Sequence, residues 1–197
     1  MGAIRDFFFP NVKPSSITDV DASLRPFTVS ETLLNNVGAG MTATRGQAMS
    51  IPAIQRAQQI ICSTIGSLPL EQYVKATGAH VEASRVIHQP DPSTTGSLVY
   101  AYTASDLFFY GAAFWQCTDA YAEDGRVRAA QYIPYERISP QLDASGTKIL
   151  GYYIDNVPAP LSGVGSIIPF YALSDGLLFK AGRTIRAALA LEEAAER

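Results

Sequence analysis

The sequence predicts an α+β fold in which a few helices accompany short antiparallel strands and hairpins. Residues 52–66 and 96–110 have apolar residues at helical spacing, whereas residues 113–154 are rich in aromatic and β-branched residues interrupted by turn signals. Apolar residues make up 47% of the 197 residues and charged residues only 17%. A chain of this composition can bury a sizeable core within one domain.

The first 49 residues differ from the rest of the chain. They mix Pro, Ser, Thr, Asn and Gly, including Val37-Gly38-Ala39-Gly40, and have no sustained helical or strand period. We therefore expect residues 1–49 to form an N-terminal arm that is partly irregular, and residues 50–197 to form the α+β domain.

A helix is expected directly after the arm. Ser50 is a candidate N-cap, and Pro52 is tolerated in the first turn because the N–H that it lacks has no helical partner there. Gly66 and Pro69 end this helix, and residues 70–74 are expected to form a short strand. One helical stripe of apolar residues should be buried: Ile54, Ala57, Ile61 and Ile65.

A turn, a loop and a second helix follow. Thr77-Gly78 is a turn signal. Residues 88–93, with the sequence HQPDPS, form a rigid polar loop because a residue that precedes proline avoids the helical region. Residues 96–110 then have apolar spacing that is compatible with a helix.

The middle of the chain is expected to be mainly β. Residues 113–121 and 126–133 have β-type composition and are joined by Asp124-Gly125, a strong tight-turn signal, so they predict a hairpin. Prolines bound a further short segment at residues 134–140, and Ser145-Gly146 separates it from a strand at residues 149–154. A second hairpin results.

The end of the domain combines an irregular stretch with a helix. Residues 157–165 are rich in Pro and Gly, and Pro169 confines the following apolar run to a sheet edge or an irregular end. The last helix has the core-facing candidates Leu178, Ile185, Ala188 and Leu189, whereas Arg183, Arg186, Glu192, Glu193 and Glu196 suit its opposite side. No Gly or Pro ends this pattern near Arg197.

No motif in the sequence predicts catalytic, cofactor or metal chemistry. Gly163-Val164-Gly165 lacks the third glycine of a dinucleotide fingerprint, and residues 176–180 lack the Gly-Lys-Ser/Thr ending of a phosphate loop, so a plain loop is favoured there. His80 and His88 have no Cys, His or carboxylate at metal-ligand spacing and are expected in surface loops. The carboxylates of residues 192, 193 and 196 fit a solvated helix face.

The remaining candidates are interpreted as core residues. Trp115 and the aromatic residues before it could stack bases, but no basic residues are interleaved with them, so this cluster is expected to form the main core. Cys62 and Cys117 lie in apolar settings without a Cys-x-x-Cys motif and are expected as buried thiols. The longest nearly apolar stretch, residues 107–115, is far shorter than the roughly 20 residues of a membrane-spanning helix, so no membrane partner is expected.

Four segments in a fixed order carry a resemblance to a known family. They are residues 67–73 (SLPLEQY) directly after the first helix, residues 88–92 (HQPDP), residues 110–115 (YGAAFW) with the Asp-Gly hairpin after them, and residues 132–138 (YIPYERI). Together they resemble the N-terminal, or wing, portion of tailed-phage portal proteins across residues 50–197. Asp91 and Ala112 stand where that family usually has Asn. The likeness weakens after Gly165, because Pro169 replaces a frequent His and no Gly-x-Ser-Pro precedes the last helix.

The resemblance implies a structural role and no enzymatic activity. Portal subunits form a dodecameric ring that serves as the DNA packaging and ejection conduit and as the head-tail connector. The implied partners are further copies of the chain, the major capsid protein, the terminase large subunit, a head-tail adaptor, and double-stranded DNA that passes without tight binding. The implied localisation is the virion, after assembly in the host cytoplasm. The chain is expected to stop before the stem, clip and crown segments of that family.

Composition agrees with weak DNA binding, and two alternative functions stay open. The formal net charge is -3 and the 15 Lys and Arg residues are scattered, so no basic stripe predicts a tight grip on phosphates. The first alternative is a free-standing capsid or tail adaptor. The second is a small-molecule enzyme or binding domain with a pocket near Trp115. The sequence identifies no DNA-binding or subunit-interface residues.

Overall fold

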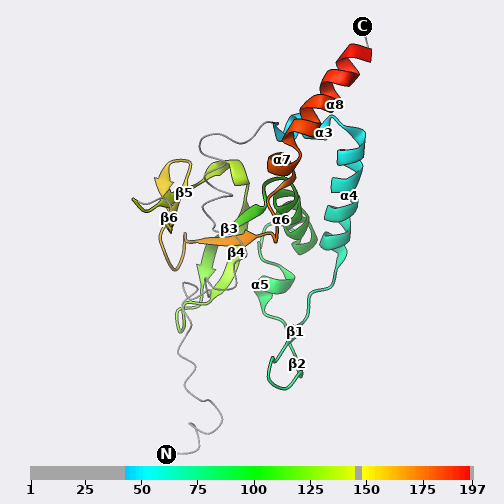
Figure 1. The fold of residues 1–197 in the computed structure, drawn as a ribbon. Coiled ribbons are helices and arrows are strands. Elements are labelled where there is room, and N and C mark those ends of the chain that lie inside the picture. The colour runs from blue at the N-terminus through cyan, green and yellow to red at the C-terminus, as the bar shows by residue number, and fades with distance from the viewer. Residues whose placement is uncertain (1–42, 145–147, 196–197) are drawn as a thin grey trace, which may run out of the picture.

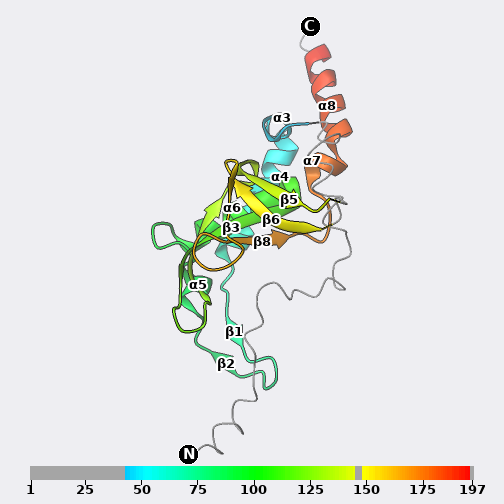
Figure 2. The same cartoon turned by 90° about the vertical axis from the view of Figure 1, so that its left-hand side faces the viewer.

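The computed structural model describes residues 43–144 and 148–195 and confirms the α+β class. Figure 1 shows the helices on one side of the molecule and the two three-stranded sheets on the other, while Figure 2 shows α8 and the β1–β2 hairpin extending from opposite ends. The elements are α3 (Arg45–Met49), α4 (Pro52–Ser67), β1 (Gln72–Tyr73), β2 (His80–Val81), α5 (Arg85–His88), α6 (Gly96–Tyr110), β3 (Ala112–Ala120), β4 (Val127–Ile133), η3 (Tyr135–Arg137), β5 (Ile138–Leu142), β6 (Ile149–Ile154), β7 (Val157–Pro158), β8 (Ile167–Tyr171), α7 (Leu177–Lys180) and α8 (Gly182–Ala195).

The packed part of the chain begins within the predicted arm. Thr44 caps α3 through a reciprocal pair of bonds with Gln47, and Ala43 and Ala48 are buried in the main core. Ser50 is the C-cap of α3, so its predicted role as the N-cap of the next helix is wrong; Ile51 takes that place without a side-chain bond. Residues 1–42 of the predicted arm lie outside the described residues.

Helix α4 forms where the sequence predicts it but packs through a different face. It approaches α6 closely at Gly66, where an added Cβ would lie 2.8 Å from the carbonyl oxygen of Ser97. Cys62, one turn earlier, is buried. Ile61 and Ile65 are exposed, so the predicted burial of their stripe is wrong for the second half of the helix. Small side chains allow close helix packing, which the apolar pattern alone does not reveal.

The short elements after α4 only partly match the prediction. The strand expected at residues 70–74 is limited to β1, which pairs with β2 across a turn in which Gly78 has a φ of 65°. His88, the first residue of the predicted polar loop, is the last residue of α5. Asp91 in the same loop is buried and accepts hydrogen bonds from the backbone N–H of Ser93 at 2.8 Å and from the Ser93 hydroxyl at 2.7 Å.

The second helix and the first hairpin are confirmed. Helix α6 ends at Gly111, which adopts a φ of 76°, and this left-handed residue turns the chain directly into β3. Strands β3 and β4 pair antiparallel, with Phe114 opposite Ile133, and Gly125 takes a φ of 69° in the turn.

Strand β8 is an edge strand, as Pro169 predicts. The sheet order is β4-β3-β8. Cys117 donates its N–H to Ser166 at 2.9 Å, and Ala172 donates to Gly111 at 2.9 Å. Since bonded pairs alternate along an antiparallel ladder, Pro169, opposite Phe114, occupies a non-bonded position, and its nitrogen points to the open edge.

The second predicted hairpin is present as the antiparallel pair β5–β6, and β7 extends this sheet. The predicted turn at Ser145-Gly146 lies outside the described residues. Tyr152 and Ile154 of β6 pack against the main core, and the hydroxyls of Tyr152 and Tyr171 are 2.6 Å apart. This contact links the second sheet to β8 of the first.

The predicted last helix is two helices, because the chain breaks at Ala181 between α7 and α8. The plain loop expected at residues 176–180 is therefore wrong, since residues 177–180 form α7. Leu178 and Ile185 are buried, Leu189 packs partly against the core, and Ala188 is half-buried, as predicted. The residues assigned to the opposite side, Arg183, Arg186, Glu192 and Glu193, are exposed, and Glu196 lies outside the described residues.

Candidate functional site

The residues considered for chemistry do not form a reactive site. His80 lies on β2 and His88 ends α5, so neither is in a loop, although both are exposed as predicted. Within residues 43–144 and 148–195, no cluster of three His, Cys, Asp or Glu side chains could hold a metal ion. Across the same residues, no helix is both long and apolar enough to span a membrane.

The glycines at residues 163 and 165 form a turn beside β3. Both have positive φ angles, 77° and 91°. The N–H of Gly165 donates to the carbonyl oxygen of Cys117 at 2.7 Å, so this amide is occupied by the strand and does not face a ligand. The turn therefore anchors the segment between β7 and β8.

Trp115 belongs to the core, as expected. Its ring lies between Tyr100, at 5.7 Å, and Phe170, at 4.7 Å between ring centroids. Its indole N–H donates to the Thr103 hydroxyl at 2.8 Å. Only 5% of the residue is exposed, so it offers no surface on which a base could stack. It packs with Val99 and Ala130 in a smaller cluster beside the main one.

The main core contains most of the aromatic residues that were predicted to form it. Its buried members come from both halves of the molecule: Ala43, Ala48, Phe109, Tyr110, Ala112, Phe114, Ile133, Tyr135, Ile138, Leu178 and Ile185. The rings of Tyr110 and Tyr135 stack 4.2 Å apart and nearly parallel. This pair joins the end of α6 to the exit of β4.

A buried carboxylate, Asp106, organises a polar network inside this core. Its Oδ1 accepts from a guanidinium nitrogen of Arg45 at 3.2 Å. Its Oδ2 accepts from the Tyr132 hydroxyl at 2.7 Å and from the backbone N–H of Tyr135 at 3.0 Å. The side chain is fully buried. The network therefore fixes α3, α6, β4 and η3 relative to one another.

Burial dominates the electrostatics of this network. Loss of water raises the pKa of the Asp106 carboxyl to about 6, although the bonds from Tyr132 and Tyr135 and the charge of Arg45 oppose that change. Burial also raises the pKa of the Tyr132 and Tyr135 hydroxyls, with the Asp106 charge as the next cause. The arrangement fits a structural polar core, since the bonds to Asp106 join α3, β4 and η3 to α6.

Sequence reasoning missed Asp106 and its partner. Arg45 lies in the segment predicted as an arm, where no pattern assigned it to the core. The available signal was that Asp106 is the single charged residue in the apolar helix at residues 96–110. A lone charge in a buried helix requires a partner elsewhere in the chain.

The second notable feature is an open groove between α4 and α6. It has a volume of about 390 Å³ and an uncharged lining: Cys62, Ser63, Gly66, Ser67, Thr95, Ser97, Leu98 and Ala101. Cys62 and Cys117 are both free thiols and buried, as predicted, and burial raises the pKa of each. The groove lies away from Trp115, where the sequence placed the pocket of the enzyme alternative.

Comparison with known proteins gives matches to solved structures. No family model matches the chain, and no curated protein matches it. An HK97-family phage portal protein from Corynebacterium diphtheriae matches with a TM-score of 0.62 and 25% identity, over 80% of this chain and 50% of that protein.

Two structures from gene transfer agent (GTA) particles share the fold. The neck of the empty GTA particle, computed with C6 symmetry, matches with a TM-score of 0.54 and 14% identity, over 83% of this chain and 49% of the other. The neck of the native particle, computed with C12 symmetry, gives a TM-score of 0.52 and 14% identity over 76% and 42%. The chain thus spans about half the length of these structures. The chain therefore has a portal-like structure, with the α+β fold that its sequence predicts.

Proposed function

We propose that this chain is the N-terminal, wing portion of a structural subunit in a phage portal ring. The observation that carries the proposal is the match to the HK97-family portal protein over 80% of the chain, with a TM-score of 0.62 and 25% identity. In this role the subunit is a head-tail connector and, with the rest of the ring, the conduit for DNA packaging and ejection.

Four described arginines are already paired with carboxylates, which suits a conduit through which DNA slides. Arg128 pairs with Asp119 at 3.4 Å, and Arg126 and Arg137 pair with aspartates close to them. Arg45 forms an ion pair with Asp106 in the core. Cations that are paired with carboxylates release fewer counterions from DNA, so these four arginines do not favour tight phosphate binding. No described residue is assigned to DNA contact.

The proposal includes a set of partners and a location. Further copies of the chain form the ring, which we propose to be dodecameric, and the GTA necks with C6 and C12 symmetry support a ring of this kind. The major capsid protein, the terminase large subunit and a head-tail adaptor are the proposed protein partners. Assembly in the host cytoplasm and residence in the virion complete the proposal.

The test is deletion of the gene from the element that produces the particles, followed by measurement of nuclease-protected DNA in the particle fraction. A portal subunit is needed before DNA enters the head, so deletion should abolish protected DNA, and a copy in trans should restore it. Heads that fill with DNA but lack tails would identify a free-standing adaptor instead. Unchanged particles would remove the structural role and leave the small-molecule alternative.

A further inference from the structure

Helix α4 exposes an apolar surface that no other part of residues 43–144 and 148–195 covers. Ile61, Ile65 and Leu68 follow one another at helical spacing on the same side of the helix, and Leu70 is a further exposed apolar residue just beyond its end. All four are exposed, and Leu68 is 55% exposed. We call these four residues the α4 face. Residues 57–70 contain no charged side chain, and depletion of charge is typical of the centre of a protein interface.

A second apolar surface lies on the segment between β7 and β8. Val157, Leu161 and Val164 are exposed by 64%, 75% and 60%, and residues 157–165 contain no charge. We call these three residues the β7 face. A methyl group of Leu161 lies 3.4 Å from where a Cβ on Gly151 would be, so this side chain rests against β6.

The β7 face is presented on an anchored segment. Ala159 donates its N–H to Tyr152 at 2.8 Å, and Gly165 donates to Cys117 at 2.7 Å. Anchoring at both ends reduces the conformational entropy that binding would remove. The segment should therefore lose little conformational entropy when it binds a matching surface.

The α4 face offers such a surface. The groove between α4 and α6 contains none of its four residues, because the groove is lined on α4 by Cys62, Ser63, Gly66 and Ser67, on another side of the helix. An apolar side chain such as that of Leu161 can pack on the uncharged α4 face without desolvating an ion.

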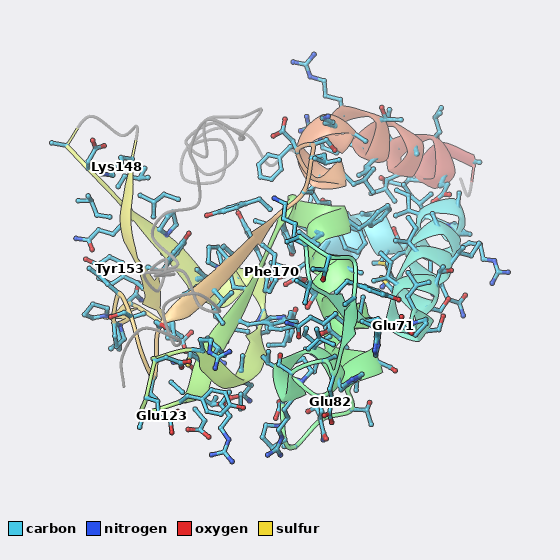
Figure 3. The ribbon with its side chains drawn as sticks, turned by 90° about the horizontal axis from the view of Figure 1, so that it is seen from below. Glu71, Glu82, Glu123, Lys148, Tyr153 and Phe170 are labelled. Carbon is cyan, nitrogen blue, oxygen red and sulfur yellow. The ribbon has the colours of Figure 1, made fainter. Side chains whose placement is uncertain are left out.

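The two faces lie on opposite sides of one copy. Figure 1 shows α4 at one side and β5 and β6 at the other, and in Figure 3 Lys148 and Tyr153 mark the sheet side, far from Glu71 next to α4. Different surfaces on opposite sides cannot satisfy each other within one copy. Between copies they form a head-to-tail contact, and such contacts close into rings when the rotation allows it.

We propose that the β7 face of one copy docks onto the α4 face of the next copy. The proposal rests on the ring described under the proposed function and names the surfaces that join its subunits. It commits to a second copy of this chain as the occupant, because both faces are apolar and uncharged, because they lie on opposite sides of one copy, and because the GTA necks that share the fold were computed with C6 and C12 symmetry.

Photo-cross-linking in particle-producing cells tests the contact directly. A benzophenone amino acid replaces Ile65 in the full gene product, and the cross-linked peptides are mapped by mass spectrometry. We expect a second copy of the chain, joined within residues 149–166. A cross-link to α4 of the second copy, to another protein, or to nothing at all would overturn the proposal. The same probe at Glu123, outside both faces, is the matched control and should not join residues 149–166.

Mixing of two purified variants tests the head-to-tail arrangement. Ile65→Glu damages only the α4 face, and Leu161→Glu damages only the β7 face; each should weaken self-association at least about tenfold. Mixed together, they should form a heterodimer and nothing larger, because one intact face remains on each. If the mixture associates no better than the separate variants, each face pairs with itself and the proposal fails.

Two further measurements make the result specific. Leu173→Glu, at a position 87% exposed outside both faces, should leave association unchanged. Emission from the buried Trp115 should be the same in all variants, since the substituted positions are exposed. The heterodimer reports on the faces alone, whereas nuclease-protected DNA reports on the portal role, so the failure of one proposal is distinguishable from the failure of the other.

Discussion

Replacing Asp106 with Asn should remove a pH dependence from the stability of the domain. The carboxyl has a pKa of about 6 in the folded protein, against an ordinary value of 3.8, because it is buried. Below pH 3.8 the carboxyl is protonated in both states, and its contribution to stability is fully present. That contribution is lost as the pH rises to about 6, because the unfolded chain releases the proton more readily than the folded one.

The magnitude follows from the two pKa values. The difference between 3.8 and about 6 corresponds to about 3 kcal/mol in the free energy of unfolding. Asp106→Asn cannot ionise, so the wild type should lose about 3 kcal/mol relative to the variant between pH 3.5 and pH 7.5. Asp106→Asn also removes the ion pair with Arg45, which adds an offset to the variant's free energy of unfolding. The way in which the stability difference between wild type and variant changes with pH reports the ionisation of Asp106.

Urea unfolding at pH 3.5, 4.5, 5.5, 6.5 and 7.5 provides the measurement, with emission from Trp115, the single tryptophan, as the probe. Asp119→Asn is the matched control, because Asp119 is half-exposed and its pair with Arg128 should contribute at most about 1 kcal/mol. A flat difference between wild type and Asp106→Asn would refute the reasoning. A difference that changes in the opposite direction would mean that the ion pair with Arg45 outweighs burial.

Three substitutions and one control substitution test the packing. Gly66→Val should lower the free energy of unfolding by about 1–3 kcal/mol, because the valine side chain would meet the backbone of α6. Gly46→Ala, whose added Cβ would have its nearest contact at 3.9 Å, should be neutral or stabilising. The midpoints of urea unfolding compare the two variants. Thr103→Val should cost about 1–3 kcal/mol by leaving the indole N–H of Trp115 without its acceptor, measured by circular dichroism during denaturation. Gly176→Ala should prevent native packing, because its Cβ would lie 2.2 Å from the carbonyl oxygen of Phe109; a cooperative unfolding transition equal to that of the wild type would contradict this.

The elements that the sequence predicts well are those whose signals are local. The helix at residues 96–110 has the predicted bounds because Gly111 ends it in a left-handed conformation that glycine favours. The hairpin around Gly125 follows from an equally local turn signal. Pro169 lacks a backbone N–H donor, so it marks a sheet edge independently of the rest of the fold.

The errors arise where distant segments decide the structure. The buried face of α4 depends on how closely α6 approaches at Gly66, and no periodicity within α4 contains that information. The burial of Asp106 depends on Arg45, sixty-one residues earlier in the chain. Ile61 and Ile65 of the exposed α4 face have the spacing of a core stripe, so the sequence predicted that they would be buried.

The proline in β8 has a consequence for a protein that is crowded among copies of itself. The outward-pointing positions of this strand are residues 167, 169 and 171, and the middle one has no N–H to offer. A strand from another molecule would find donors only at the two ends, about 13 Å apart. The open edge is therefore a poor template for adding strands, and it resists the sheet-to-sheet aggregation that a continuous edge invites.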